Sequence, residues 1–164
     1  LLGLNSLFNL GFSFTDLEEL AAQLGSDCAF FIRGGLQLAK GRGELLEILP
    51  PFERQVRLVL CNPQIHVSTA AAYSGVSPNA SRVPITDLLG EKKINLLQND
   101  FERSVFQKFP AIAQIKEELI NAGAFYAAMS GSGSSAFGLY EIDQRFNLSS
   151  MVQQSIIYNG VWNF

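Results

Sequence analysis

The chain has 164 residues, of which 48% are hydrophobic and 16% charged, and its formal net charge is −3. This length and composition predict a globular protein with a sizeable core and exclude a disordered chain. The acidic balance argues against nucleic acid as a partner, and no apolar run reaches the roughly 18 residues of a membrane span, so we expect a cytoplasmic protein with neither partner.

The first part of the chain predicts two helices. Apolar residues at helical spacing over 2–10, followed by Gly11, predict the end of a helix. Because the chain starts inside this pattern and without methionine, we expect a fragment that begins within that helix. Thr15 and Glu18 have the spacing of a capping box, which predicts a second helix running to about Leu24.

A β-hairpin is expected next. An apolar run over 28–32 precedes two further runs, over 36–40 and 45–49, and the sequence Gly41-Arg42-Gly43 between the last two predicts a glycine turn. Pro50-Pro51 then interrupts the pattern, so we place a domain boundary there, between residues 1–50 and residues 51–164.

The second part opens with a predicted strand over Gln55 to Cys61. Alternation within this run places Val56, Leu58 and Leu60 on one face. A polar region that we expect to be mostly loop follows, and it contains Pro63, Pro78 and Pro84.

Helices and strands alternate in the remainder. Apolar spacing over 99–109 predicts a helix, and Pro110 suits the first turn of another that runs through Ile120. Short apolar runs over 124–128 and 136–140 predict two buried strands, and the tail over 147–164 is expected to hold a helix and an edge strand. This order predicts an α+β sandwich with helices on one face of a mostly antiparallel sheet.

The serine-glycine loop, Ser130 to Ser135, joins those two predicted strands. Gly131 and Gly133 allow positive φ and close approach of a ligand, and successive backbone N–H groups can bind an anion. The hydroxyls of Ser130 and Ser132 add donors. A simple hairpin turn explains the same residues equally well.

Asp27 is a candidate catalytic carboxylate. It follows a helix end and precedes an apolar run, so it is expected on a turn where it could accept a proton or hold a hydroxyl group. An ordinary turn or N-cap aspartate is the alternative. At the predicted hairpin tip Arg42 could contact a phosphate, although a turn with surface charges explains it as well.

The segment from Pro63 to Tyr73 is a candidate substrate site. Ser68 or Thr69 is expected to cap a short helix whose start would favour an anion, and Tyr73 could stack on a flat ring. A capped helix with a core tyrosine is the alternative. His66, the only histidine, is interpreted as a loop residue with at most a substrate contact, because neither histidines nor cysteines cluster for a metal site.

Taken together, these segments resemble the GHMP superfamily of small-molecule kinases, and the resemblance covers nearly all of residues 1–141. In one of the matching segments, 99–102, the acidic residues also have a purely structural explanation, because acidic side chains at the start of a helix complement its dipole. The matching pieces, in the family's order, are Leu24-Gly25-Ser26-Asp27-Cys28-Ala29-Phe30-Phe31, Gly34-Gly35, Gly41-Arg42-Gly43-Glu44, Pro63 with Val67-Ser68-Thr69-Ala70 and Tyr73, Asn99-Asp100-Phe101-Glu102, and the serine-glycine loop.

The resemblance implies a fold and an activity. Residues 1–50 would be the end of the ATP-binding domain, which is ribosomal protein S5 domain 2-like, and residues 51–164 a ferredoxin-like substrate domain. The implied reaction transfers the γ-phosphoryl group of ATP, with Mg²⁺, to the 2-hydroxyl of a methylerythritol that carries a cytidine diphosphate, in non-mevalonate isoprenoid (terpenoid) biosynthesis. Other small-molecule kinases of the superfamily and a non-catalytic ferredoxin-like binding module are the alternatives.

The resemblance also implies residue roles. Asp27 matches the aspartate that orients or deprotonates the hydroxyl, Thr69 and Tyr73 match the cytidine-diphosphate pocket, and Gly131 and Gly133 lie on the family's third glycine-rich motif. Ala29 departs from the family's usual proline. The family's ATP phosphate loop and a lysine lie before the start of this chain, so we expect the 164 residues alone to be inactive.

Overall fold

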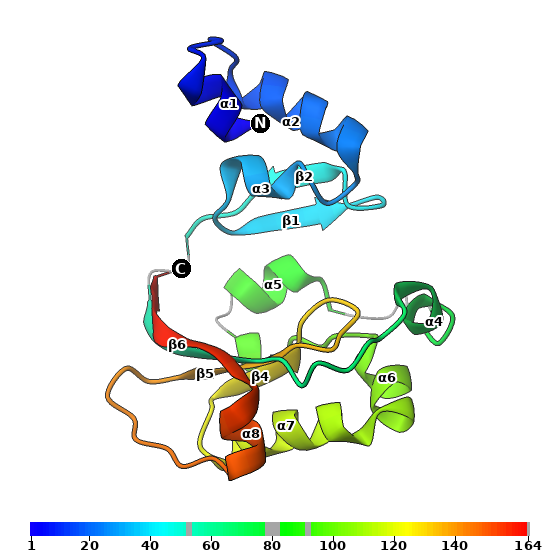
Figure 1. Cartoon of the computed structure of the whole chain (residues 1–164), viewed down its shortest axis with the longest axis vertical. Helices are drawn as coiled ribbons and strands as arrows, with labels where there is room; N and C mark the ends of the chain where they lie inside the picture. Colours follow the sequence, from blue (N-terminus) through cyan, green and yellow to red (C-terminus); the bar gives the residue numbers. More distant parts are fainter. Residues whose placement is uncertain (52–53, 78–82, 91–92, 164) are drawn as a thin grey trace. The chain divides into compact units, whose positions relative to one another are not determined.

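The computed structural model describes residues 1–51, 54–77, 83–90 and 93–163. The chain divides into two compact units, Leu1–Arg54 and Gln55–Trp162 (Figure 1). Among the described residues, no helix is both long and apolar enough to cross a membrane. Pro78, which we expected in a loop, lies outside the described residues.

The first unit consists of short helices followed by a two-stranded hairpin. A small core of Leu17, Ala21, Ala29 and Ile32 joins its second and third helices. The elements are α1 (Leu2–Leu7), α2 (Phe14–Leu24), α3 (Phe30–Arg33), β1 (Gln37–Lys40) and β2 (Leu45–Ile48), with the two strands antiparallel.

The start of α2 differs from the prediction. Ser13, not Thr15, is the N-cap: its hydroxyl accepts from Asp16 N at 3.2 Å, and the Asp16 carboxylate accepts from Ser13 N at 2.8 Å. This reciprocal pair satisfies two of the N–H groups that a helix start leaves open, so the box predicted two residues later has no role. Glu18 instead accepts a hydrogen bond from Arg33 at 2.7 Å.

The second unit is a four-stranded sheet with the order β4-β5-β3-β6, in which β5 is antiparallel to both β3 and β4. Helices α6, α7 and α8 lie on one side of this sheet (Figure 1). Its elements are β3 (Gln55–Cys61), α4 (Thr69–Tyr73), α5 (Ile85–Gly90), the 3₁₀ helix η1 (Ile94–Leu96), α6 (Glu102–Lys108), α7 (Pro110–Asn121), β4 (Tyr126–Met129), β5 (Ala136–Tyr140), α8 (Ser150–Ser155) and β6 (Ile156–Asn163).

The predicted strand over Gln55 to Cys61 is confirmed as β3, in which Val56, Leu58 and Leu60 alternate on one face. The sequence did not predict how deeply each face is buried: Val56, Val59 and Cys61 are fully buried, whereas the two leucines are half-buried. The reason is that α7 and α8 pack on the side of the strand that carries Val59 and Cys61. Two short helices, α5 and η1, form after Pro84 within the region that the sequence predicts to be mostly loop.

Tyr140 gives the second unit a pH-dependent stability. Its buried phenol donates to Leu119 O at 3.0 Å, and burial, followed by the charges of Cys61 and Glu118, raises the pKa of the phenol well above its ordinary value. Because the unfolded chain then loses this proton first, the stabilisation is complete below about pH 10 and is lost as the pH rises above it.

We therefore expect Tyr140→Phe to lower the free energy of unfolding at neutral pH by about 0.5–1.5 kcal/mol, the usual value of one hydrogen bond. The loss of stability between neutral and strongly alkaline pH should be shallower in the variant than in the wild type. Urea unfolding at the two pH values measures both effects. Burial also raises the pKa of Cys61, so a smaller alkaline loss remains in the variant. Equal alkaline losses in the two proteins would contradict the assignment to Tyr140.

Candidate active site

The serine-glycine loop is a closed turn between β4 and β5. Ser130 N donates to Ser135 O at 2.8 Å, and Gly133 N donates to Ser130 O at 3.1 Å. Gly131 and Gly133 have φ values of 55° and 100°, in the region that favours glycine. The backbone of this turn therefore favours glycine at both positions.

Two backbone N–H groups of the loop are available to a ligand. Within the described residues, neither Gly131 N nor Ser132 N has a hydrogen-bond acceptor. An ideal Cβ built on Gly131 also meets no atom within 4 Å, so the space beside this residue is open. Consecutive N–H groups beside open space are suited to binding an anion.

Helix α4 brings a predicted substrate residue to this loop. Ser68 is the N-cap, and the hydroxyl of Thr69, the first helical residue, lies 3.2 Å from the hydroxyl of Ser132. The structure thus joins two residues that the sequence places 63 positions apart. Because α4 contains only five residues, few peptide dipoles add up at its start, and the expected attraction of an anion to this end is small.

Tyr73 ends α4 and is 64% exposed. This exposure contradicts the alternative of a core tyrosine and leaves the ring accessible for stacking. Its support is Phe101, whose ring centre lies 4.8 Å away at an interplanar angle of 71°. His66 is exposed in the segment between β3 and α4, as the sequence predicts.

Asn99 and Glu102 contact the serine-glycine loop and its base, and neither is among the site residues predicted from the sequence. The Asn99 side-chain amide donates to Met129 O at 2.7 Å and to Gly131 O at 2.8 Å. Glu102 Oε1 accepts from Met129 N at 2.8 Å, and its other oxygen accepts from Lys116 Nζ at 2.5 Å. The one available signal was that residues 99–102 belong to the matching segments.

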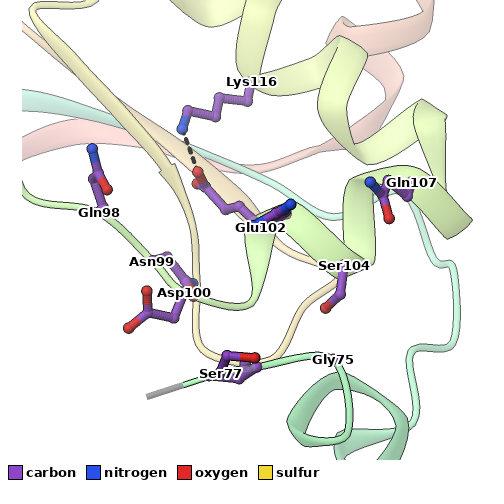
Figure 2. A pocket seen from close by; sticks show the side chains of 11 residues that line it. Gly75, Ser77, Gln98, Asn99, Asp100, Glu102, Ser104, Gln107 and Lys116 are labelled. Carbon is purple, nitrogen blue, oxygen red and sulfur yellow. Dashed lines mark hydrogen bonds and ion pairs between the residues drawn. The ribbon is translucent and has the colours of Figure 1, made fainter. Parts of the chain in front are cut away.

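These side chains also line a polar pocket of about 810 Å³. Figure 2 shows Lys116 reaching the Glu102 carboxylate, while Gly75 and Ser77 come from the segment after α4. None of the sequence-predicted substrate residues, Thr69, Tyr73 or His66, lines this pocket. The pocket is therefore lined by Asn99 and Glu102, which hold the loop, and not by Tyr73.

Asp27 lies in the first unit, in the turn between α2 and α3, and is exposed. The hairpin tip approaches it: a Cβ on Gly43, whose φ is 110°, would lie 2.9 Å from Asp27 Oδ1. Glycine at this position therefore leaves room for the carboxylate. Two segments that the sequence singled out separately, the turn and the tip, thus meet in the fold.

Comparison with known proteins defines the family. Residues 87–154 match the family model described as GHMP kinases C terminal. A 4-diphosphocytidyl-2-C-methyl-D-erythritol kinase from Cytophaga hutchinsonii is 44% identical over 144 residues, which are 84% of this chain and 52% of that protein. The chain therefore carries the C-terminal domain of the GHMP kinase family.

Solved structures agree with this assignment. A crystal structure of 4-(cytidine 5'-diphospho)-2C-methyl-D-erythritol kinase is 27% identical, with a TM-score of 0.75 over 99% of this chain and 60% of that one. A homoserine kinase from Cytophaga hutchinsonii is 17% identical with a TM-score of 0.59, over 98% of this chain and 60% of that one, and this likeness concerns the fold alone. The predicted α+β fold and family are confirmed, and the chain spans about half the length of the curated relative.

Proposed function

We propose that the protein containing this sequence transfers the γ-phosphoryl group of ATP to the 2-hydroxyl of 4-diphosphocytidyl-2-C-methyl-D-erythritol, a step in non-mevalonate isoprenoid precursor biosynthesis. The observation that carries the proposal is the 44% identity with a relative of that name across 84% of this chain. In this proposal residues 1–50 complete an ATP-binding domain, residues 51–164 form the substrate domain, and the protein is cytoplasmic.

Asp27 is assigned to the reacting hydroxyl. Phosphoryl transfer passes through a loose transition state, so orienting the hydroxyl and stabilising charge contribute more than early removal of its proton. An exposed carboxylate on a turn, with Gly43 leaving space beside it, is suited to accept a hydrogen bond from that hydroxyl. As the new O–P bond forms, the bond between the γ-phosphorus and the bridging oxygen of ATP breaks and ADP leaves, while the proton of the hydroxyl passes to Asp27 or to solvent.

The cytidine diphosphate is assigned to the second unit. The exposed ring of Tyr73 is suited to stack on cytosine, with Thr69 beside it and His66 on the neighbouring loop. Ser130 to Gly133 are assigned to the phosphate side, because the open N–H groups of Gly131 and Ser132 and the serine hydroxyls are suited to anionic oxygens.

No side chain of the described residues is assigned as a ligand of Mg²⁺ in this proposal. The described ranges contain no group of three or more His, Cys, Asp or Glu side chains that could hold a metal ion. In kinases Mg²⁺ is usually bound by substrate phosphates and one or two carboxylates, where it neutralises charge on the phosphates. The residues described here are thus compatible with a metal that the phosphates carry.

A substrate assay tests the proposal. The complete gene product containing these 164 residues would be incubated with ATP, Mg²⁺ and 4-diphosphocytidyl-2-C-methyl-D-erythritol, and ADP and the phosphorylated product would be measured. Homoserine and mevalonate serve as competing alcohols for the other small-molecule kinases. Of the three alcohols, we expect only 4-diphosphocytidyl-2-C-methyl-D-erythritol to be phosphorylated. Turnover with another alcohol instead, or nucleotide binding without turnover, would contradict the proposal.

The role of Tyr73 leads to a binding prediction. Tyr73→Ala should weaken the binding of cytidine diphosphate by about 1–3 kcal/mol, or roughly 5- to 150-fold in Kd, because a base loses its stacking partner. Tyr73→Phe keeps an aromatic face and should bind nearly as the wild type does. Tyr158→Ala, at a partly exposed tyrosine of β6, is the matched control. Calorimetric titration measures all four proteins, and unchanged affinity in Tyr73→Ala would place cytosine elsewhere.

A further inference from the structure

One short segment of the second unit contacts both of the candidate substrate elements. Residues 99–102 run from the segment after η1 into the start of α6. Phe101 packs against the ring of Tyr73. Asn99 binds the backbone of the serine-glycine loop at Gly131, and Asn99 and Glu102 both bind the backbone of Met129, directly before the loop. The ring and the loop are thus held by neighbouring positions of the same backbone.

The contacts converge on Met129, where β4 ends and the loop begins. Glu102 accepts its N–H at 2.8 Å, and Asn99 donates to its carbonyl at 2.7 Å, so both polar groups of this peptide residue are fixed by side chains from one segment. The Met129 side chain is fully buried and packs with Ile112 and Val105. Its backbone therefore has little freedom to move.

Asn99 extends this hold into the loop itself. Its amide group has two N–H bonds, and the second reaches Gly131 O at 2.8 Å. Its carbonyl oxygen accepts from Phe101 N at 2.9 Å, which fixes the orientation of the amide. Because Gly131 O is bound, the peptide plane that follows, with the free N–H of Ser132, is also oriented.

Lys116 fixes the carboxylate in turn. Its ammonium group, on α7, contacts Glu102 Oε2 at 2.5 Å, and the side chains of the pair are only 24% and 13% exposed (Figure 2). A hydrogen bond between a charged carboxylate and a backbone N–H is stronger than one between neutral groups. Glu102 thus links α7, α6 and β4 at the base of the loop.

We propose that Asn99 and Glu102 are positioning residues, which hold the serine-glycine loop in the conformation that receives phosphate and keep it aligned with Tyr73. This inference rests on the proposed function of the loop. Sites of phosphoryl transfer depend on groups held close to their productive geometry by a supporting shell of hydrogen bonds, and these two side chains supply such a shell here.

The first test is Asn99→Asp in the complete gene product. Aspartate has nearly the same shape and keeps an oxygen for Phe101 N–H, but it has no N–H for the two carbonyls. We expect kcat to fall by about 10- to 100-fold and the loop amides to exchange their hydrogens faster. The affinity for cytidine, which lacks the phosphates assigned to the loop, should not change, because the contact between Phe101 and Tyr73 is kept. Asn95→Asp, an exposed position in η1, is the matched control and should behave as the wild type.

The second test separates positioning from general stability. Glu102→Gln loses the ion pair with Lys116 but keeps an oxygen for Met129 N–H, whereas Glu102→Ala loses both. We expect glutamine to restore most of the kcat and the slow loop exchange that alanine removes. A purely structural role would instead lower the unfolding midpoint in both variants and leave kcat at saturating substrate unchanged.

The outcomes separate this inference from the proposed function. Wild-type protein without kinase activity contradicts the proposed function, on which the inference depends. Active wild-type protein together with an Asn99→Asp variant of unchanged kcat and unchanged loop exchange overturns the inference alone. Lower kcat in Asn99→Asp, a normal Asn95→Asp control and rescue by Glu102→Gln support it.

Discussion

Replacement of Asp27 by asparagine is expected to lower kcat by about 10²–10⁴-fold, the range in which a positioned acid or base contributes to catalysis. Asparagine has nearly the same shape and fits the same turn. It presents one neutral acceptor and an N–H₂ group where the carboxylate presents two charged oxygens. The expected loss is therefore in the orientation and deprotonation of the hydroxyl, with the KM for the cytidine substrate little changed.

The structure offers a matched control for this variant. Asp143 is exposed in the turn after β5, and Asp143→Asn makes the same change of charge in the second unit. Steady-state kinetics of the two variants, with ADP release as the readout, compares them directly. A normal rate in Asp27→Asn would remove Asp27 from the reaction, and an equal loss in Asp143→Asn would show that net charge rather than position matters.

The sequence predicted those helices and turns whose determining residues lie within the element itself. The hairpin of β1 and β2 follows from glycines between two apolar runs, and α7 follows from Pro110 at its first turn and apolar residues at helical spacing. In both cases the chemistry that fixes the backbone lies within the element. The same holds for Gly131 and Gly133, whose positive φ values are a property of the turn itself.

Where two nearby residues or two faces of a strand fit the same role, the sequence did not predict which of them has it. Ser13 and Thr15 are both of a residue type that caps helices, and each has an acidic residue three positions later, but only Ser13 is the N-cap in the structure. Likewise the alternation in β3 identifies two faces but does not say which one α7 and α8 will cover. Such decisions depend on packing against elements that are distant in the sequence.

The contacts of Asn99 and Glu102 with the serine-glycine loop and its base could not be predicted from local sequence patterns. A glutamate at a helix start is explained by the helix dipole, yet the Glu102 carboxylate binds the N–H of a residue 27 positions further along the chain. Asn99 reaches 30 and 32 positions to Met129 and Gly131. Only the fold brings these partners together, so the sequence could indicate the segment through its resemblance but not its role.

Asparagine substitutions at the two loop glycines should separate folding from ligand binding. A Cβ on Gly133 would lie 3.1 Å from Met129 Sδ and 3.4 Å from Val67 Cγ2, and its φ of 100° lies outside the left-handed helical region that asparagine tolerates. Gly133→Asn should therefore lower the free energy of unfolding by about 1–3 kcal/mol or more, and kcat/KM by about 10²-fold as the loop is displaced.

Gly131→Asn is the matched variant. Its φ of 55° suits asparagine, and a Cβ there meets nothing within 4 Å, so the free energy of unfolding should fall by less than in Gly133→Asn. If phosphate groups occupy the open space, the new side chain obstructs them, and kcat/KM falls while stability is largely kept. Denaturant unfolding and steady-state kinetics on both variants measure these effects. Full activity in Gly131→Asn would contradict the phosphate-side role of the loop. Wild-type stability in Gly133→Asn would contradict the clash expected between its Cβ and the side chains of Met129 and Val67. The two variants thus test different physical reasons for glycine, open space for a ligand at Gly131 and close packing at Gly133.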